Sequence, residues 1–301
     1  MTQTVLLAGA TGMLGSHIAR HLLDLPEARV RLLVRSGEDL GKRAAVLDPL
    51  LARGAEVVEG DLADRASLDR ATQGVDVIVS AVQGGPEVIV AGQVALAKAG
   101  RRNGVRRILP SDYALDLFRS PPGEHMLFDL RRAADEQIAA TGIEHVHVLQ
   151  GAFMEMFRPG PGVIGADGVG RFWGDGTQPI DTTSVEDTAR MAARVSLDRG
   201  LSSSKFSFAG DRISTLDAAS TVEAQTGRHF ERRSLGSEAD LRAALAKAKD
   251  DPQAAVMLAY QLTMLTGQTA LSDLQNDRYP DLELESFTRF AARTLPRAAA
   301  A

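Results

Sequence analysis

The sequence has 301 residues, of which 44% are hydrophobic and 24% charged, with a formal net charge of −5 and no cysteine. A chain of this length can bury a substantial core in one large or two modest domains. The lack of cysteine excludes disulfides, thiolate nucleophiles and cysteine-held metal or iron–sulfur sites, and the mild acidity gives no electrostatic reason to expect nucleic acid or an anionic membrane as a partner.

The first forty residues predict a strand, a glycine-rich turn, a helix and a second strand. An apolar run at 5–8 ends in the segment 9–15, GATGMLG, and a helical pattern through Ile18 and Leu22 leads to a second apolar run at 30–34. A glycine triplet that directly follows a strand and opens a helix is typical of the unit that binds the pyrophosphate of a dinucleotide.

Each glycine of this turn has a chemical reason. Gly9 allows the tight turn, Gly12 lets the backbone approach the pyrophosphate, and Gly15 lets the helix pack closely on the strand. The helix N-terminus offers N–H groups and a partial positive charge to the phosphates. We therefore predict that the turn contacts the cofactor through Gly9, Thr11, Gly12, Met13, Leu14 and Gly15.

The residue after the second apolar run selects the dinucleotide. NAD-binding enzymes usually place Asp or Glu about 20 residues beyond the last glycine, where it accepts from a ribose hydroxyl. Arg35 stands there instead, with Lys42 close behind. A guanidinium suits a 2′-phosphate through charge-assisted hydrogen bonds, so the sequence predicts NADP(H). The alternative is an exposed arginine that contacts nothing.

Four more strands alternate with helices up to residue 150. We predict the strands at 55–59, 75–80, 105–109 and 144–149, and the helices at 42–53 (interrupted at Asp48-Pro49), 66–72, 86–99 (ended by Gly100) and 126–140. This alternation predicts an α/β fold, a Rossmann-type doubly wound parallel sheet.

Ligands bind at the carboxyl ends of such strands, so the following loops are cofactor candidates. These candidates are Asp61, Leu62, Ser80, Ala81, Val82, Gln83, Gln150, Gly151 and Phe153. Asp61 could reach the adenine or ribose, or it could be a turn or N-cap residue.

Beyond Phe157 the pattern loosens through a Gly- and Pro-rich stretch at 158–176. Further on we predict a helix from Ser184 toward residue 195, a strand at 205–209, and helices at 215–226, 237–250 and 252–266. We expect a Rossmann domain at 1–155, a smaller, mainly helical substrate lobe at 156–297 with some segments returning to the core, and a disordered tail at 298–301. A shared apolar pocket is predicted from Phe153, Met154, Phe157, Phe172, Trp173, Tyr260 and Met264; each could equally be plain core.

Several segments together resemble the NmrA-like and isoflavone-reductase-like atypical short-chain dehydrogenases. The segments are GATGMLG at 9–15, LVR at 33–35, EGDL at 59–62, VRRILPS at 105–111, GI at 142–143, GAF at 151–153 and, more faintly, RYP at 278–280. The resemblance implies a Rossmann core, NADP(H) and a substrate pocket roofed by the C-terminal lobe. It also places Arg35 on the 2′-phosphate arginine and Lys42 on its helper.

The catalytic residues depart from the family pattern. Short-chain dehydrogenases usually rely on Tyr-x-x-x-Lys, but Leu117 stands four residues after Tyr113. The isoflavone-reductase branch uses a lysine that aligns with Arg131, and a guanidinium cannot readily donate a proton. It can still bind an anion or stabilise a developing oxyanion.

Three residues nevertheless remain candidates for catalysis. Tyr113 lies just past a strand end and could protonate a reduced carbonyl with help from Ser111, or it could be packing under the loop. Arg131 lies on an otherwise apolar helical stripe, where a charge needs a ligand or an ion pair such as Asp135 at i+4.

The histidines give little support for a metal. His145 and His147 lie in the middle of a predicted strand, which favours buried neutral imidazoles. His17 and His21 are four residues apart on the first predicted helix, without a third ligand nearby. No metal site is therefore predicted.

These observations predict an NADPH-dependent oxidoreductase that reduces a small aromatic or apolar carbonyl or enone. The opposing hypothesis is a non-catalytic, NADP(H)-binding redox sensor of the NmrA type. A soluble cytoplasmic protein is expected, with no uninterrupted apolar run near the ~18 residues of a membrane span. We expect no nucleic-acid or membrane partner, and a homodimer or a protein partner is open.

Overall fold

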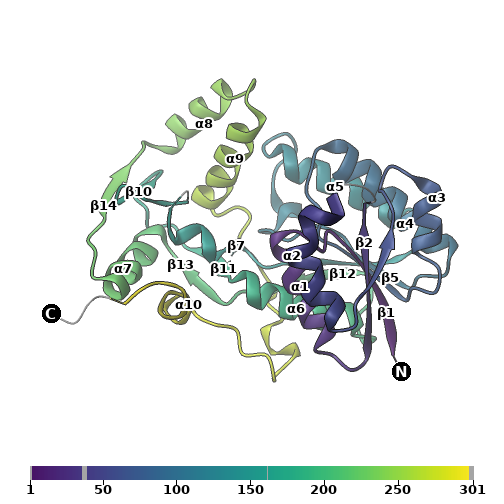
Figure 1. Cartoon of the computed structure of the whole chain (residues 1–301). Coiled ribbons are helices and arrows are strands. Elements are labelled where there is room, and N and C mark those ends of the chain that lie inside the picture. The colour runs from purple at the N-terminus through teal and green to yellow at the C-terminus, as the bar shows by residue number, and fades with distance from the viewer. Residues whose placement is uncertain (1, 36–38, 161, 298–301) are drawn as a thin grey trace. The chain divides into compact units, whose positions relative to one another are not determined.

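The computed structural model describes residues 2–35, 39–160 and 162–297. The chain divides into two compact units, each built from several segments (Figure 1). The first unit comprises Met1–Tyr113, Leu130–Val148 and Thr188–Phe206, and the second comprises Ala114–Asp129, Leu149–Asp187 and Ser207–Ala301. Residues 188–206 therefore lie in the first unit, whereas residues 114–129 and 149–155, which precede the boundary expected at 155, lie in the second.

A seven-stranded sheet organises the first unit, in the order β12-β6-β5-β4-β1-β2-β3. Its strands are β1 (Gln3–Ala8), β2 (Ala28–Val34), β3 (Glu56–Glu59), β4 (Val77–Ser80), β5 (Arg107–Leu109), β6 (Glu144–Leu149) and β12 (Ser204–Ser207). The neighbouring pairs from β3 to β6 are parallel. The chain reverses its direction of winding between β1 and β4, which confirms the doubly wound sheet and places its switch point there.

The helices follow the strands as the alternation predicts. They are α1 (Met13–Leu23), α2 (Asp39–Ala52), α3 (Arg65–Ala71), a π-helix (Glu87–Gly92) that runs into α4 (Gln93–Arg102), α5 (Met126–Ala139) and α6 (Val185–Leu197). Side chains of α3, α4 and α5, including Leu68, Leu96 and Ile138, form one buried cluster with Leu6 and Ile78 of the sheet. This burial, more than helix propensity, holds the layers together.

Two predictions about helices were wrong, one about an interruption and one about a helix end. The expected interruption at Asp48-Pro49 is absent, because Pro49 lies inside α2. Leu47 and Leu50 on either side of it are buried, and this packing outweighs the hydrogen bond that proline removes. Gly100 does not end α4, which continues to Arg102. A Cβ at Gly100 would come within 2.7 Å of Ile78 Cδ1, so this glycine permits close contact between helix and sheet.

The second unit combines helices with two small sheets. The helices are α7 (Thr215–Thr226), α8 (Glu238–Lys247), α9 (Pro252–Thr266) and α10 (Phe287–Thr294). The sheets are β14-β10-β9-β8 and β13-β11-β7, with strands β7 (Ala152–Phe153), β8 (Pro159–Gly160), β9 (Ile164–Gly165), β10 (Val169–Phe172), β11 (Ile180–Thr183), β13 (Asp211–Ile213) and β14 (Glu231–Ser234). The lobe thus contains helices as predicted, and the described residues of the Gly- and Pro-rich stretch at 158–176 include the strands β8, β9 and β10.

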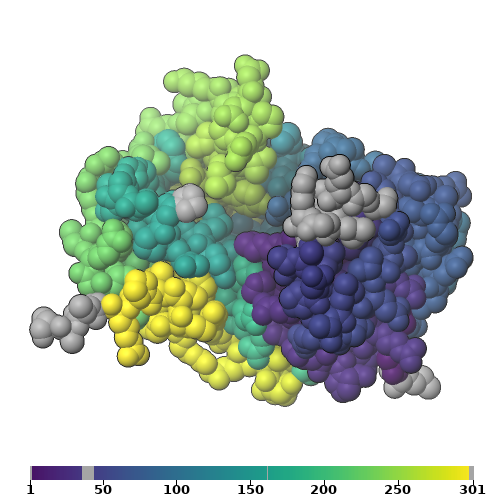
Figure 2. Space-filling view, viewed as in Figure 1, coloured from purple at the N-terminus to yellow at the C-terminus, as the bar shows by residue number. Residues whose placement is uncertain are grey.

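Capping residues and buried aromatic rings define the second unit. Ser214 and Ser237 form capping boxes at the starts of α7 and α8. Figure 2 shows α10, in yellow, at the surface of this unit, and its buried face carries Phe287 and Phe290. These two rings pack into a cluster with Phe157. The tail predicted at 298–301 lies outside the described residues, among which no helix is long and apolar enough to cross a membrane.

Candidate functional site

The glycine turn after β1 meets the loop after β4 at the switch point of the sheet. Gly9 has φ +85°, and a Cβ there would overlap the carbonyl oxygen of Ala81. A Cβ at Gly15 would overlap the carbonyl oxygen of Gly9. The Ala81 N–H donates to the Ala8 carbonyl at 2.9 Å. Both glycines are therefore required by close approaches of backbone to backbone, as predicted from their spacing.

The start of α1 has the properties of an anion-binding helix terminus. Gly12 is the N-cap with φ −78°, no side chain caps the helix, and its first turn carries no acidic residue. The positive end of the helix dipole and its uncapped N–H groups are thus available to a phosphate. Thr11 is half-buried, the Met13 side chain is 57% exposed, and Leu14 turns into the core. The residues present fit the pyrophosphate of a dinucleotide.

Arg35 is exposed directly after β2. That is the position from which a guanidinium can reach a 2′-phosphate, and its contact with one stays a prediction. Lys42 lies in α2, but its side chain is outside the part of the chain that the structure describes.

Asp61 and Leu62 follow β3. The Asp61 carboxylate accepts from the Ala63 N–H at 2.8 Å, which is the turn alternative for this residue. Leu62 is half-buried, and a Cβ at Gly92 in the π-helix would lie only 2.9 Å from its Cβ. Leu62 therefore packs against the π-helix, and the contacts of both residues with a cofactor stay predictions.

The loop after β4 is tied to the loop after β5. The Ser111 hydroxyl donates to the Val82 carbonyl, and the Ser111 N–H donates to Gln93 Oε1, each at 2.8 Å. Ser80 is fully buried, and its hydroxyl has no hydrogen-bond partner among the described residues. Gln83 is exposed beyond it. Ser111 thus positions a loop that is predicted to touch the cofactor.

Tyr113 is buried, with 7% of its surface exposed. Its hydroxyl has no hydrogen-bond partner within the described ranges of the chain. Burial, and secondarily the carboxylate of Asp112, raise the pKa of this phenol above its usual value. Tyr113 therefore stays neutral at physiological pH, which makes it a poor proton donor but a competent hydrogen-bond donor.

Arg131 is buried in α5, 6% exposed. Asp135, one turn later and 5% exposed, has its pKa raised to about 9, because burial and the Asp112 carboxylate outweigh the opposing charge of Arg131. The charge of Arg131 therefore acts on Asp135, but the net effect of the surroundings favours the neutral carboxyl. The ion pair offered as the alternative for Arg131 stays a prediction. A catalytic role for Arg131 stays a prediction.

The structure reveals a buried cluster that the sequence reasoning missed. His147 Nδ1 lies 2.7 Å from Asp112 Oδ2 and 3.7 Å from Asp135 Oδ2. His147 was predicted to be a buried imidazole, and it is buried, but its proximity to two carboxylates was not predicted. His145 is only half-buried, with its Nδ1 3.1 Å from the Ile143 carbonyl oxygen. The three residues of the cluster come from a loop, a strand and a helix. Their proximity therefore cannot be predicted from their spacing in the sequence.

Three predicted cofactor residues lie in the second unit: Gln150 and Gly151 join β6 to β7, and Phe153 ends β7. Gln150 is buried, and its side-chain amide donates to the Gly151 carbonyl at 3.0 Å. The backbone carbonyl of Gln150 accepts from the Thr183 hydroxyl at 2.7 Å. Gly151 has φ +80°, and a Cβ there would overlap the Asp181 carbonyl oxygen. Phe153 is half-buried in β7. These contacts give Gln150 and Gly151 a local structural role. Contact of the three residues with the cofactor stays a prediction.

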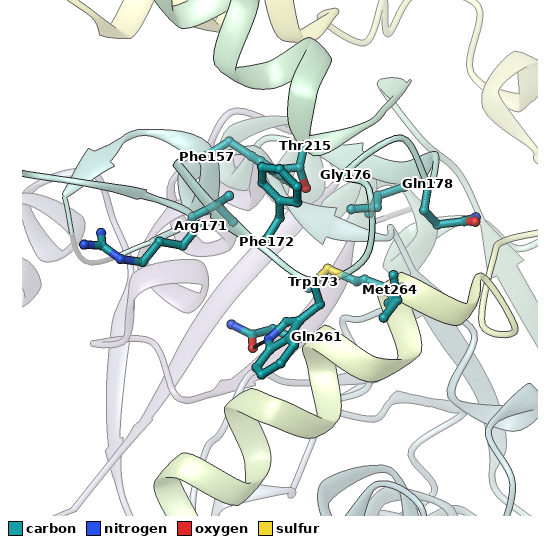
Figure 3. A pocket seen from close by; sticks show the side chains of 12 residues that line it. Phe157, Arg171, Phe172, Trp173, Gly176, Gln178, Thr215, Gln261 and Met264 are labelled. Atoms are coloured by element: carbon teal, nitrogen blue, oxygen red, sulfur yellow. Dashed lines mark hydrogen bonds between the residues drawn. The ribbon is translucent and has the colours of Figure 1, made fainter. Parts of the chain in front are cut away.

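An aromatic pocket lies within the second unit (Figure 3). Of the seven predicted lining residues, Phe157, Phe172, Trp173 and Met264 line it. Its other lining residues are Val163, Arg171, Gly176, Gln178, Ile180, Thr215, Gln261 and Leu265. Met154 is instead core, and Tyr260 packs edge-on to the His125 ring at 4.3 Å.

The pocket is mainly apolar with a few polar groups. The Trp173 indole N–H donates to Gln261 Oε1 at 2.8 Å. The Arg171 guanidinium points away from the aromatic rings in Figure 3 and pairs with Asp167 at 2.6 Å. The cavity volume is about 60 Å³, whereas a cavity of about 150 Å³ accommodates benzene. An aromatic ring therefore enters fully only if the lining side chains move.

Known proteins share this architecture. Phenylcoumaran benzylic ether reductase PT1 of Pinus taeda is 33% identical over 158 residues, 51% of this chain and 50% of that protein, so the chain aligns with half the length of this relative. Pinoresinol reductase 1 of Arabidopsis thaliana is 26% identical over 299 residues, 93% of either chain. The solved complex of leucoanthocyanidin reductase with NADPH from Vitis vinifera has the same fold, with a TM-score of 0.85 and 22% identity over 96% of this chain and 98% of that one.

The family resemblance stated from the motifs is confirmed over most of the chain. The NmrA-like family profile matches residues 1–264, which includes the glycine turn, Arg35 and the loops after β4 and β5. The match continues through α5 and the aromatic pocket into α9. This chain belongs to the NmrA-like family.

Proposed function

We propose that this protein is an NADPH-dependent oxidoreductase that reduces a small aromatic or apolar carbonyl or enone. The observation that carries the proposal is the uncapped start of α1 behind the Gly9–Gly15 turn, with Arg35 at the end of the neighbouring strand β2. The relatives support it, since by name they are reductases of phenylcoumaran benzylic ethers and of pinoresinol, and the Vitis vinifera neighbour was solved with NADPH.

In this proposal, different backbone and side-chain groups bind different parts of NADPH. The backbone at Gly9 and Gly12 approaches the pyrophosphate, and the N-terminus of α1 neutralises part of its charge. Arg35 binds the 2′-phosphate through charge-assisted hydrogen bonds. Ser111 holds the loop after β4 through its bond to Val82. When bound, NADPH supplies the hydride.

Two residues would meet the charge that develops on the substrate. Tyr113 offers a protonated hydroxyl with no other partner in the described part of the chain, so it can donate to an oxygen as that oxygen gains negative charge. The Arg131 guanidinium supplies a permanent positive charge for the same purpose. In this proposal both stabilise charge by hydrogen bonding and electrostatics, and the final proton comes from solvent.

The pocket of the second unit supports an aromatic or apolar substrate. Phe157, Phe172 and Trp173 present ring surfaces to the pocket. The side-chain oxygen of Gln261 already accepts a hydrogen bond from the Trp173 indole N–H. Such a lining favours a flat, weakly polar group over a charged one, because desolvating a charge is costly.

A second candidate function is a redox sensor that binds NADP(H) without turning it over. One observation favours it: α5, whose sequence is MLFDLRRAADEQIA, contains no lysine, and Arg131 stands where the isoflavone-reductase branch is expected to have its catalytic lysine. Loss of a general acid costs a factor of roughly 10²–10⁴ in rate.

Two measurements on the purified chain separate these functions. Calorimetric titration with NADPH and with NADP⁺ tests cofactor binding, and absorbance at the NADPH band with a panel of aromatic aldehydes, ketones and enones tests turnover. Binding of NADPH with oxidation by a panel member supports the reductase. Similar affinity for both forms without oxidation supports the sensor, and no binding of either form overturns both.

A further inference from the structure

Asp112, Asp135 and His147 converge inside the first unit. Asp112 follows β5, His147 lies on β6 and Asp135 on α5, and one ligand atom from each lies within 4.8 Å of the others. Their exposed fractions are 0%, 5% and 7%, so all three are nearly or fully removed from solvent. We propose that these three residues form a binding site for one divalent transition metal ion, with Zn²⁺ as its probe.

The polar atoms of this cluster are incompletely satisfied. The Asp112–His147 contact at 2.7 Å uses one carboxylate oxygen. Among the described residues, Asp112 Oδ1 and both carboxylate oxygens of Asp135 have no hydrogen-bond partner. A buried polar group without a partner costs about 1–3 kcal/mol, and more when it is charged. Three such oxygens at one place point to a ligand that contacts several of them together.

A metal ion meets this need better than a proton. A proton on Asp135 supplies one hydrogen-bond donor, which can satisfy one acceptor. The remaining carboxylate oxygens would still have no partner. A divalent ion can take one oxygen from each aspartate and Nδ1 of His147. Its double positive charge balances the two carboxylates, for which the nearby guanidinium of Arg131 compensates only in part.

The donor set and its dimensions suit zinc or a similar ion. Imidazole nitrogen and carboxylate oxygen are ligands of Zn²⁺ at about 2.0–2.2 Å, so two ligands of one tetrahedral ion lie roughly 3.3 Å apart. The contacts of His147 Nδ1 at 2.7 Å and 3.7 Å bracket that separation. Shifts of about half an ångström therefore form the site, and a further carboxylate oxygen can supply the fourth ligand.

Formation of the site does not depend on the proposed reductase function, although Asp112 is next to Tyr113 in the chain and Arg131 acts on the charge of Asp135. The site is formed within one compact unit and needs neither cofactor nor substrate. Because the ligands are buried, we expect the ion to be incorporated while the chain folds and to exchange slowly afterwards.

The test is the metal content of the full chain. Untagged wild-type protein, expressed in zinc-supplemented medium and desalted in the presence of a chelator, should hold close to one Zn²⁺ per chain by mass spectrometry of the metals. Asp135→Asn keeps the size of the side chain but removes its charge, and it should hold at least tenfold less. Glu136→Gln, an exposed neighbour on α5, loses the same charge outside the cluster and should bind like the wild type.

Two results would overturn the site: a wild-type content below one tenth of an ion per chain, or equal contents in wild type and Asp135→Asn. Circular dichroism checks that the variant is folded. If it is not, His147→Gln takes its place with the same expected loss, and an unchanged content in that variant equally rules the site out.

Discussion

Arg35 stands at the end of β2, where a carboxylate would bind the ribose of NAD and a guanidinium suits a 2′-phosphate. The surrounding backbone is fixed by β2, so the side chain can change without altering the fold. Tyr113 and Asp135 are different, because both are buried and their environments shift their pKa values. Arg35 is thus an exposed residue proposed to select the cofactor, whereas Tyr113 and Asp135 are buried and carry polar atoms without a hydrogen-bond partner among the described residues.

We expect Arg35→Asp to weaken NADPH binding while NADH binding changes little. A charge-assisted contact is worth about 1.5–3 kcal/mol, which corresponds to a factor of roughly 10–150 in affinity. Arg29→Asp is the matched control, because Arg29 is exposed near the opposite end of the same strand. Calorimetric titration of both variants measures the change. Unchanged NADPH affinity in Arg35→Asp would remove Arg35 from the site.

Tyr113→Phe should lower kcat by a factor of about 10²–10³, the usual effect of losing one donor to a developing oxyanion. The NADPH affinity should stay the same. Because the pKa of the phenol is raised, the wild-type rate should show no ionisation of Tyr113 between pH 7 and 9. Steady-state kinetics with an identified substrate measure both. Full turnover by the phenylalanine variant contradicts the role.

At the scale of elements, glycines of one turn have separable functions. Gly15 allows α1 to approach the carbonyl of Gly9, and a Cβ there would overlap it. Gly12 has an ordinary φ of −78°, and a Cβ there would meet only the Gly9 oxygen, at 3.3 Å. Gly15 therefore serves the packing of α1, whereas Gly12 is the glycine that we expect to leave room for a ligand.

Two substitutions should separate these functions. Gly12→Ala should fold with nearly wild-type stability and bind NADPH more weakly, because its methyl group occupies the space of the phosphates. Gly15→Ala should lower the free energy of unfolding, by about 1–3 kcal/mol as overpacking does. Urea denaturation and NADPH titration of each variant give the two readouts. An equal loss of stability in both variants would refute the distinction.

The start of α6 carries a pH-dependent contact. The Val185 N–H lies 3.1 Å and 3.2 Å from the two carboxylate oxygens of Glu155. Burial, more than any other cause, raises the pKa of Glu155 above its usual value. The folded protein therefore holds this proton more tightly than the unfolded chain, and the resulting stabilisation is present below the unfolded pKa and lost as pH rises through the folded one.

Glu155→Gln keeps an acceptor for the Val185 N–H but cannot ionise. We therefore expect the stability of wild type relative to this variant to decline as pH rises from about 4 to 8. Urea denaturation across this range measures the difference in free energy of unfolding. A difference that is constant with pH, or that grows in favour of the wild type, would contradict the assignment.

At the scale of the whole molecule, the chain crosses between its two compact units several times. The glycine turn at 9–15 belongs to the first unit, as do Tyr113, Arg131 and the Asp112–Asp135–His147 cluster. The aromatic pocket belongs to the second. Cofactor binding by the first unit and ligand binding by the pocket of the second unit can therefore be tested separately. A negative result in one test does not account for a negative result in the other.

Trp173 is the only tryptophan in the sequence and lines the aromatic pocket. A ligand that enters the pocket should change the fluorescence of this indole, with a saturable dependence on concentration. An aryl ketone and its cyclohexyl analogue form a matched pair of probes, and the flat ring should bind more tightly because it stacks on aromatic faces. No saturable change with either probe would argue against the pocket as the substrate site.

The sequence was sufficient for the features that depend on neighbouring residues. Apolar periodicity predicted β6, α7 and α9 to within a residue, because side-chain direction repeats every two or 3.6 residues. The glycine turn could be assigned from spacing, since backbone overlap at Gly9 and Gly15 excludes any larger side chain there. The position of Arg35 followed from the end of its strand.

Other features depend on contacts between distant segments, and only the tertiary structure decided them. The strand expected at 205–209 joins the main sheet beside β6, and Pro49 remains inside α2 because buried leucines on either side outweigh its missing donor. Asp112 meets His147 from 35 residues away. Local rules determine what a segment can form, whereas burial and desolvation act only after the fold has brought remote side chains together.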